Sequence, residues 1–426
     1  MKNFLRAITG PVLSSAFFLS GCAAPRGGSE DHAYIAYWPP AGSGGTRVAV
    51  KDLIDMKGLV TTAGSEFLAK TSPPAKRDAA CLRGVRGGNV QIVGKTNLTE
   101  LAVGVSGIND YFGTPKNPVS QKRKLIPGGS SSGSAVAVLN GTADIAIGTD
   151  TAGSIRVPAA CCGIFGLKTT FGLVPLDGVY PIAPNHLDTV GPMAKDVALT
   201  VRGMDLLQEG FAGRYRRATA AQPSARSIKI GRLYVSGTQT KVDRAVDDAL
   251  AMTGFKVVVL DKVFQAQWKQ ADKDAKTVAA ASAWLSDEKF KTTWGVSTRT
   301  KAIVALGAYE YRTNYRDALK RQAAWQSTLR RVFEKVDFIA LPTLQGLPPS
   351  IPFFGGTPAF EALVLVAQNT AAVNLAGNPA LAIPIPVADK AVAVTSLQLI
   401  GPPLSEAGLL NAGRLVEARM KISARR

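Results

Sequence analysis

Hydrophobic positions along this chain form two kinds of segment, which alternate over most of its length. Short apolar runs predict strands, and they fall at 48–50, 91–97, 143–147, 227–235, 255–260, 336–342, 380–387 and 393–400. Apolar residues at helical spacing predict helices, and these fall at 75–86, 135–138, 241–253, 265–290, 300–335, 360–375 and 405–420. Since no repeat or internal linker interrupts this alternation, we predict one large α/β domain. Its mixed, mostly parallel sheet should carry helices on both faces.

Two turns rich in glycine and serine flank a small-residue helix and a short strand between residues 128 and 156. In the first turn, Gly-Gly precedes three serines, Ser130 to Ser132; the second turn, Thr-Ala-Gly-Ser, ends at Ser154. Small residues let the backbone approach a ligand closely, and consecutive N–H groups can bind an anion. A phosphate-binding loop or a plain surface turn has the same composition, so these turns alone do not establish catalysis.

The first 21 residues predict a targeting segment that precedes the fold. A basic start is followed by the apolar stretch 8–19, which is too short to span a membrane. The subsequent Leu-Ser-Gly-Cys22 resembles a bacterial lipoprotein signal, which implies cleavage before Cys22 and lipid on its thiol. We therefore expect 22–45 to be a tether and the protein to be anchored to the membrane in the cell envelope, on the periplasmic side. Ala23 is not acidic, which favours the outer membrane in a cell that has two. An ordinary secretory signal with an incidental Cys22 is the alternative.

Composition places the chain among globular proteins, with 426 residues, 46% apolar residues and a formal net charge of +19. The positive charge is dispersed, and neither a zinc-ligand spacing nor an RNA-binding signature accompanies it. We therefore expect no nucleic-acid partner, no metal and no cofactor. A disulfide from Cys81 to either Cys161 or Cys162 remains open.

Histidine is scarce, since His32 and His186 are the only two in the chain. A Ser-His-Asp hydrolase needs a histidine as its base, so another residue type becomes a candidate. Lys51 directly follows the apolar run 48–50, and a lysine buried there would have a lowered pKa and could accept a proton. The alternative is a surface lysine that extends its ammonium group into solvent.

Several motifs occur in the order seen in the amidase signature family. They read VAVKDLIDMKGLVTTAGS, IVGKTNLTELAVGVSGINDYFGTPKNP, GGSSSGS and GTDTAGSIRVPAACCGIFGLKTT, followed near the C-terminus by NLAGNPALAIPIPV and LQLIGPPLSEAGLL. The chain resembles that family strongly over 46–205 and moderately over 336–418. The resemblance implies an amidase domain over 46–426, with 206–335 as a variable helical insertion.

The resemblance also implies a Ser-cisSer-Lys catalytic set. Ser154 corresponds to the nucleophile, Ser130 to the bridging serine that follows a cis peptide bond, and Lys51 to the base. The separation of the two serines agrees with the family and selects Ser130 over its neighbours. The expected oxyanion donors are the backbone N–H groups of Thr151, Ala152, Gly153 and Ser154.

Further roles follow from the same resemblance. Ser131 and Asp150 are expected to support the proton relay, and Arg156 to pair with Asp150 or another buried carboxylate. The family usually has glycine at position 152, so Ala152 would strain the turn if that position required a positive φ. A substrate-lining loop is expected at Ala102, Gly104 and Ser106.

Three functions are consistent with these features. The first is an exported, membrane-anchored amidase that converts a small-molecule amide to an acid and an amine or ammonia through an acyl-enzyme. The second is a non-catalytic surface binding protein with the amidase fold. The third is a protein similar to the A subunit of glutamyl-tRNA amidotransferase, against which the export signal argues because tRNA charging is cytoplasmic.

Overall fold

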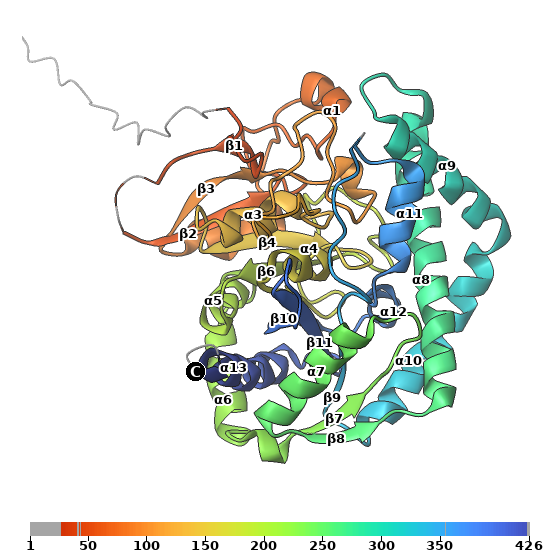
Figure 1. Ribbon diagram of the computed structural model, residues 1–426. Coiled ribbons are helices and arrows are strands. Elements are labelled where there is room, and N and C mark those ends of the chain that lie inside the picture. Colours follow the sequence, from red (N-terminus) through yellow and green to blue (C-terminus); the bar gives the residue numbers. More distant parts are fainter. Residues whose placement is uncertain (1–26, 41, 43, 354, 424–426) are drawn as a thin grey trace, which may run out of the picture.

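A computed structural model describes residues 27–423 except 41, 43 and 354. Its strands are β1 (Tyr34–Tyr37), β2 (Thr46–Lys51), β3 (Val90–Thr96), β4 (Ile145–Asp150), β5 (Phe165–Lys168), β6 (Thr189–Ala194), β7 (Lys229–Arg232), β8 (Lys256–Val259), β9 (Phe338–Pro342), β10 (Ala380–Pro386) and β11 (Val394–Ile400). In the described part of the chain they form one 11-stranded sheet, in the order β1-β3-β2-β4-β6-β5-β10-β11-β9-β7-β8 (Figure 1).

Helices cover both faces of this sheet. They are α1 (Glu66–Thr71), α2 (Arg83–Gly87), α3 (Ser132–Leu139), α4 (Arg156–Cys162), α5 (Val197–Leu207), α6 (Phe211–Ala221), α7 (Thr240–Thr253), α8 (Lys262–Asp287), α9 (Thr298–Thr313), α10 (Tyr315–Phe333), α11 (Pro358–Val366), α12 (Ala371–Ala376) and α13 (Glu406–Ser423). Successive side chains on a strand point to opposite faces of the sheet, so the residues of β2 contact the helices on both faces. Ala49 packs in a cluster with Val136 of α3, whereas Val48 and Val50 pack in the cluster that contains Val197 of α5. The predicted α/β class is confirmed.

Strand directions differ from the prediction of a mostly parallel sheet. Four neighbouring pairs are parallel, namely β2 with β3, β2 with β4, β7 with β8 and β7 with β9. The other six pairs are antiparallel. The centre of the sheet contains connections without a crossover helix, such as the short link from β10 to β11, and such links can join only antiparallel strands.

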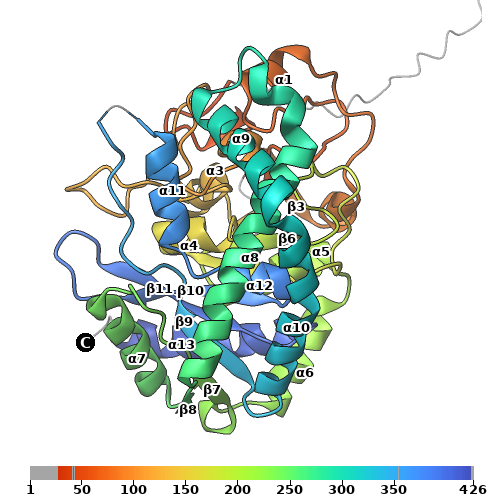
Figure 2. The same cartoon turned by 90° about the vertical axis from the view of Figure 1, so that its right-hand side faces the viewer.

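Three long helices form a separate layer beside the sheet. Figure 2 shows α8, α9 and α10 running along one side of the molecule. Trp268 of α8 and Trp325 of α10 meet edge to face, with ring centroids 5.9 Å apart. The indole N–H of Trp325 donates to the carbonyl of Ala372 at 2.8 Å, which fixes this layer to α12.

Two predicted helices are each divided in two. The helix predicted over 300–335 breaks at Asn314, whose φ of −121° is not helical and whose side chain donates to the Glu310 carboxylate at 3.0 Å. The helix predicted over 360–375 breaks because Asn369 bonds the end of β9 instead, donating from its N–H to Thr343 and from its side chain to Pro342, both at 3.0 Å.

The helix predicted over 75–86 is mostly a loop. A 3-10 turn at Ala80–Leu82 and the short α2 are its helical parts. The backbone N–H groups of Ala79 and Ala80 donate at 2.9 Å to the backbone carbonyls of Asp55 and Asp177. These N–H groups therefore bond to distant loops and not to a preceding helical turn.

Strand β1 lies inside the stretch 22–45 that was predicted to be a tether. It pairs antiparallel with β3, and Tyr34 is buried. The side chain of Asn97 donates to the carbonyl of His32 at 3.0 Å. The folded part therefore begins before residue 46. Sequence reasoning missed this strand because its buried character depends on partners more than 50 residues away.

The cysteines of the described part carry free thiols. Cys81, Cys161 and Cys162 are all buried, so neither of the disulfides left open is formed. Cys22 and the predicted signal over 1–21 lie outside the described residues. None of the helices within the described ranges is both long and apolar enough to cross a membrane.

We predict that a chain beginning at residue 46 is less stable than one beginning at residue 27. Loss of β1 removes the burial of Tyr34 and the hydrogen bond from the Asn97 side chain to the His32 carbonyl, at a combined cost of about 3 kcal/mol. Thermal unfolding of both chains, with the full chain as reference, measures the difference. Equal melting temperatures would show that β1 is dispensable.

Candidate active site

Lys51 is fully buried at the end of β2 and has hydroxyl partners. Its Nζ donates to Ser130 Oγ at 2.7 Å and to Thr149 Oγ1 at 2.9 Å. Burial lowers the pKa of Lys51 to about 7, although the charges of Asp150 and Asp188 act in the opposite direction. Near neutral pH a substantial fraction of the amine is therefore unprotonated and can accept a proton.

Ser130 lies in the turn that leads into α3, and the Gly129–Ser130 peptide bond is cis, as the resemblance implies. Gly128 has a φ of +71°, and a Cβ there would lie 2.8 Å from the sulfur of Cys161. Position 128 thus needs glycine for both its conformation and its packing. The N–H of Ser131 donates to the carbonyl of Ser154 at 3.2 Å, which joins the two turns.

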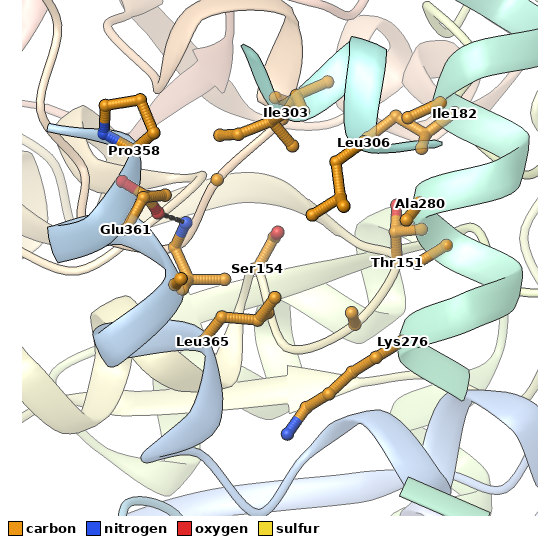
Figure 3. A pocket seen from close by; sticks show the side chains of 18 of the residues that line it. Thr151, Ser154, Ile182, Lys276, Ala280, Ile303, Leu306, Pro358, Glu361 and Leu365 are labelled. Atoms are coloured by element: carbon orange, nitrogen blue, oxygen red, sulfur yellow. Dashed lines mark hydrogen bonds between the residues drawn. The ribbon is translucent and has the colours of Figure 1, made fainter. Parts of the chain in front are cut away.

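Ser154 ends the second turn, at the wall of a pocket (Figure 3). Thr370 and Gln368 cover the other side of this turn, where a Cβ on Gly153 would collide with the Thr370 hydroxyl. Thr370 Oγ1 also donates to the carbonyl of Ala152 at 2.6 Å. The described hydrogen bonds include none between the hydroxyls of Ser130 and Ser154.

Ala152 is accommodated without backbone strain. Positive φ values occur at five non-glycine residues in the described part of the chain, and Ala152 is not among them. Its neighbour Gly153, with a φ of +138°, takes the conformation that favours glycine. The substitution of the usual glycine is therefore compatible with the geometry of the turn.

Asp150 and Arg156 form a buried ion pair beneath this turn. Arg156 Nη2 lies 2.8 Å from Asp150 Oδ1, and Nε lies 3.0 Å from Oδ2. Burial by itself raises the pKa of Asp150, but Arg156, Lys168 and a hydrogen bond from Asn374 outweigh burial and hold that pKa well below its usual range. The carboxylate is therefore charged and can orient the turn.

One expected oxyanion donor is already engaged. The N–H of Gly153 donates to Asp150 Oδ1 at 2.8 Å and so is not free to bind a developing oxyanion. The N–H groups of Thr151, Ala152 and Ser154 remain candidates. Ser131, expected to support the relay, donates from its hydroxyl to the carbonyl of Thr149 at 3.3 Å.

Asp188 positions the first residue of the turn, and sequence reasoning did not single it out. It accepts a hydrogen bond from Thr151 Oγ1 at 2.6 Å and bonds from the N–H groups of Ile182 and Ala183 at 2.9 Å. Burial raises the pKa of Asp188, against the effect of these bonds and of Lys51.

The pocket in front of Ser154 has a cavity of about 160 Å³. Its lining residues are Ala102, Val103, Gly104, Val105, Thr151, Ala152, Ser154, Ile182, Lys276, Ala279, Ala280, Ala283, Ala302, Ile303, Leu306, Pro358, Glu361, Ala362 and Leu365. Figure 3 shows side chains from α8, α9 and α11 converging on the serine. The pocket thus combines the N-terminal half of the chain, which carries Ser154, with helices from the region 206–335 and beyond.

The expected substrate-lining loop is partly in place. Ala102 and Gly104 line the pocket, but Ser106 does not. Ser106 is buried behind Glu361 of α11, to which it donates from Oγ at 2.5 Å and from its N–H at 2.8 Å, and the N–H of Val105 bonds the same carboxylate. Glu361 therefore clamps the loop to α11. No local pattern could have revealed it, because its partners lie more than 250 residues away in sequence.

Metal-binding side chains do not gather anywhere in the ranges that the structure describes. No group of three or more His, Cys, Asp or Glu residues there could hold an ion.

Comparisons with known proteins agree with this geometry. Residues 44–410 match the family model described as Amidase. The A subunit of the glutamyl-tRNA(Gln) amidotransferase of Halobacterium salinarum is 32% identical over 410 residues, covering 88% of this chain and 95% of that protein. The corresponding protein of Archaeoglobus fulgidus is 32% identical, with coverage of 88% and 86%.

Solved structures share the fold. A protein from a vestigial complex related to an s-triazine catabolic enzyme superposes with a TM-score of 0.76 at 26% identity, covering 88% of this chain and 83% of its own. The A subunit of the Thermotoga maritima glutamyl-tRNA(Gln) amidotransferase gives a TM-score of 0.72 at 27% identity, with coverage of 87% and 82%. Because the family match spans most of the sequence and the structure has the same fold, this chain belongs to the amidase family, also called the amidase signature family.

Proposed function

We propose that this protein hydrolyses a carboxylic amide through an acyl-enzyme formed on Ser154. The observation that carries the proposal is the buried hydrogen bond of 2.7 Å from Lys51 to Ser130, next to a turn that presents Ser154 to a pocket. A serine hydroxyl is a weak nucleophile unless a base activates it, and a lysine with a pKa of about 7 can supply that base.

In the proposed reaction, neutral Lys51 takes a proton from Ser130 while Ser130 takes one from Ser154. The Ser154 oxygen attacks the amide carbonyl carbon, and the N–H groups of Thr151, Ala152 and Ser154 stabilise the negative oxygen. The relay then returns a proton to the leaving nitrogen, and the C–N bond breaks. Water attacks the ester by the same relay and releases the acid. Because catalytic hydrogen bonds in unliganded enzymes are often long, we expect Ser130 and Ser154 to approach each other when substrate binds.

The sequence relatives favour a second candidate, the A subunit of a glutamyl-tRNA(Gln) amidotransferase. The A subunits from Halobacterium salinarum and Natronomonas pharaonis are 32% and 33% identical to this chain over nearly their full length. The same serine chemistry applied to glutamine would release ammonia for transfer, and the protein would act with partner subunits. A third candidate is a non-catalytic binding protein that keeps the fold and lacks turnover.

We predict that a fluorophosphonate probe labels Ser154 in the folded protein. Ser154→Ala should abolish labelling, whereas Ser132→Ala should keep it, because Ser132 lies in the neighbouring serine turn but outside the proposed relay. Mass spectrometry of the labelled peptide identifies the site. Absence of labelling in a protein shown to be folded would favour the non-catalytic candidate.

The rate of labelling should also depend on pH through Lys51. The pKa of this lysine is lowered to about 7, so the amine is protonated and inactive as a base below that pH and neutral above it. We expect the rate to rise about tenfold per pH unit below pH 7 and to level off above it. Lys51→Met should lower the rate by about 10²–10⁴-fold and remove the inflection.

Lys168 provides a matched control for this pH dependence. It is equally buried, and burial together with the charge of Arg156 lowers its pKa to about 7 as well. Its Nζ donates to the carbonyls of Thr169 and Asn378, at 2.9 and 2.8 Å, and not to a serine. Lys168→Met should therefore retain the inflection. An inflection that disappears with Lys168 and persists without Lys51 would refute the lysine-base assignment.

Export and anchoring through Cys22 form a separate part of the proposal, supported by the lipoprotein-type motif. In bacterial cells fed an alkyne fatty acid, the wild-type protein should take up the label, and Cys22→Ser should not. Ala23→Asp should keep the label and move the protein to the inner membrane. An unprocessed, unlabelled protein in the cytosol would contradict export and strengthen the amidotransferase candidate.

A further inference from the structure

We infer that the substrate carries an uncharged, apolar acyl group, which fills the pocket in front of Ser154. This inference rests on the proposed acyl-enzyme, and it narrows the substrate class to amides of aliphatic or aryl acids. It also separates the first candidate function from glutamine-dependent amide transfer.

The lining of the pocket is almost entirely hydrocarbon. Beyond the nucleophile turn, it consists of alanine, valine, isoleucine, leucine, proline and glycine, apart from Lys276 and Glu361. Figure 3 shows Ile303, Leu306 and Ile182 on the side of the cavity toward which the Ser154 hydroxyl points. An acyl chain attached to Ser154 would therefore lie against apolar side chains, and burial of its methylene groups would stabilise the complex.

Both charged residues of the lining already have partners. Lys276 Nζ lies 2.6 Å from Asp272 Oδ2, one turn earlier on α8, and in Figure 3 the ammonium group points away from the Ser154 hydroxyl. Glu361 accepts bonds from the backbone N–H groups of Val105 and Ser106 and from the Ser106 hydroxyl. The charge of each residue is thus already compensated, by Asp272 for Lys276 and by the loop at Val105 and Ser106 for Glu361.

Glutamine would fit this pocket poorly. Its α-ammonium and α-carboxylate groups would have to be desolvated, and a buried charge is strongly unfavourable without a partner. The two charged side chains of the lining are already paired, so charged groups of a bound glutamine would have to share them with Asp272 and with the loop at Val105 and Ser106. An alkyl or aryl acyl group carries no charge and needs no such partner.

The space for the acyl group arises where α8 and α9 pack against each other. Gly307 of α9 lies so close to α8 that a Cβ there would collide with the carbonyl of Ala280. Next to this contact, α8 presents Ala279, Ala280 and Ala283, whose small side chains leave the cavity open. Leu306, 57% exposed, extends the apolar surface to the mouth of the pocket.

A series of alkyl fluorophosphonates tests the inference on the whole folded protein. The second-order rate constant for labelling of Ser154 should rise about fourfold with each added methylene until the pocket is full. A probe of the same length with a terminal carboxylate should react at least tenfold more slowly than its alkyl counterpart. A parallel panel of acetamide, hexanamide, adipamate and glutamine should show the highest kcat/KM for hexanamide.

Substitution at the mouth gives a second measurement. Leu306→Glu should lower the labelling rate for long alkyl probes by about tenfold and leave the shortest probe little affected. Leu285→Glu is the matched control, because Leu285 on α8 is similarly exposed, at 52%, and lies outside the lining of this pocket. It should keep the chain-length dependence of the wild-type protein.

The outcomes separate this inference from the proposed function. Failure of every probe to label Ser154 would refute the acyl-enzyme itself. Labelling without chain-length dependence, or a preference for glutamine or for the carboxylate-tipped probe, would overturn the apolar acyl group alone. Loss of such a carboxylate preference in Lys276→Met would assign Lys276 as the residue that binds the carboxylate.

Discussion

The burial of Lys51 without a carboxylate in contact is the constraint on which the rest of the site depends. A neighbouring strand carries another buried lysine, Lys95, whose Nζ lies 2.6 Å from Asp52. Lys51 contacts hydroxyl groups instead, and its nearest acidic neighbours act on it only at longer range. Desolvation therefore dominates and brings the pKa of Lys51 to about 7, where a lysine can exchange protons in neutral solution. The chain has only two histidines, and the burial of Lys51 gives the fold a base of another residue type.

Charged residues away from the pocket hold the reacting groups in place. The Asp150–Arg156 pair ties the end of β4 to the start of α4, and Arg156 also donates to the carbonyl of Thr370 at 3.0 Å and to Gln398 at 2.8 Å. Removal of either partner would leave an uncompensated buried charge, so the turn that carries Ser154 is locked to the core. Asp188 holds Thr151 of the same turn through a hydrogen bond. Glu361, in the pocket wall, holds the loop at Val105 and Ser106.

Chemistry and specificity come from different parts of the chain. The Lys51–Ser130 pair and the Ser154 turn lie in the first half, which carries the motifs of the amidase family. The side chains that shape the cavity come largely from α8, α9 and α11. A similarity that rests on the motifs of the reaction centre therefore does not fix the shape of the pocket. The apolar lining with its paired charges is the feature of this protein that bears most directly on the choice between a hydrolase and an amidotransferase.

The sequence by itself determined the α/β class and most strand positions, because short apolar runs are local signals, and its resemblance to the amidase signature family supplied the three residues proposed for the relay. Only the tertiary structure revealed β1, the breaks at Asn314 and Asn369, the antiparallel centre of the sheet, and the engagement of the Gly153 N–H by Asp150. It also placed Ser106 behind Glu361 and made Asp188 and Glu361 part of the site. Apart from the local bonds at Gly153 and Asn314, these features depend on hydrogen bonds between segments that are distant in sequence. Periodicity and motif spacing describe neighbours along the chain, and they contain no information about which distant group will satisfy a buried donor.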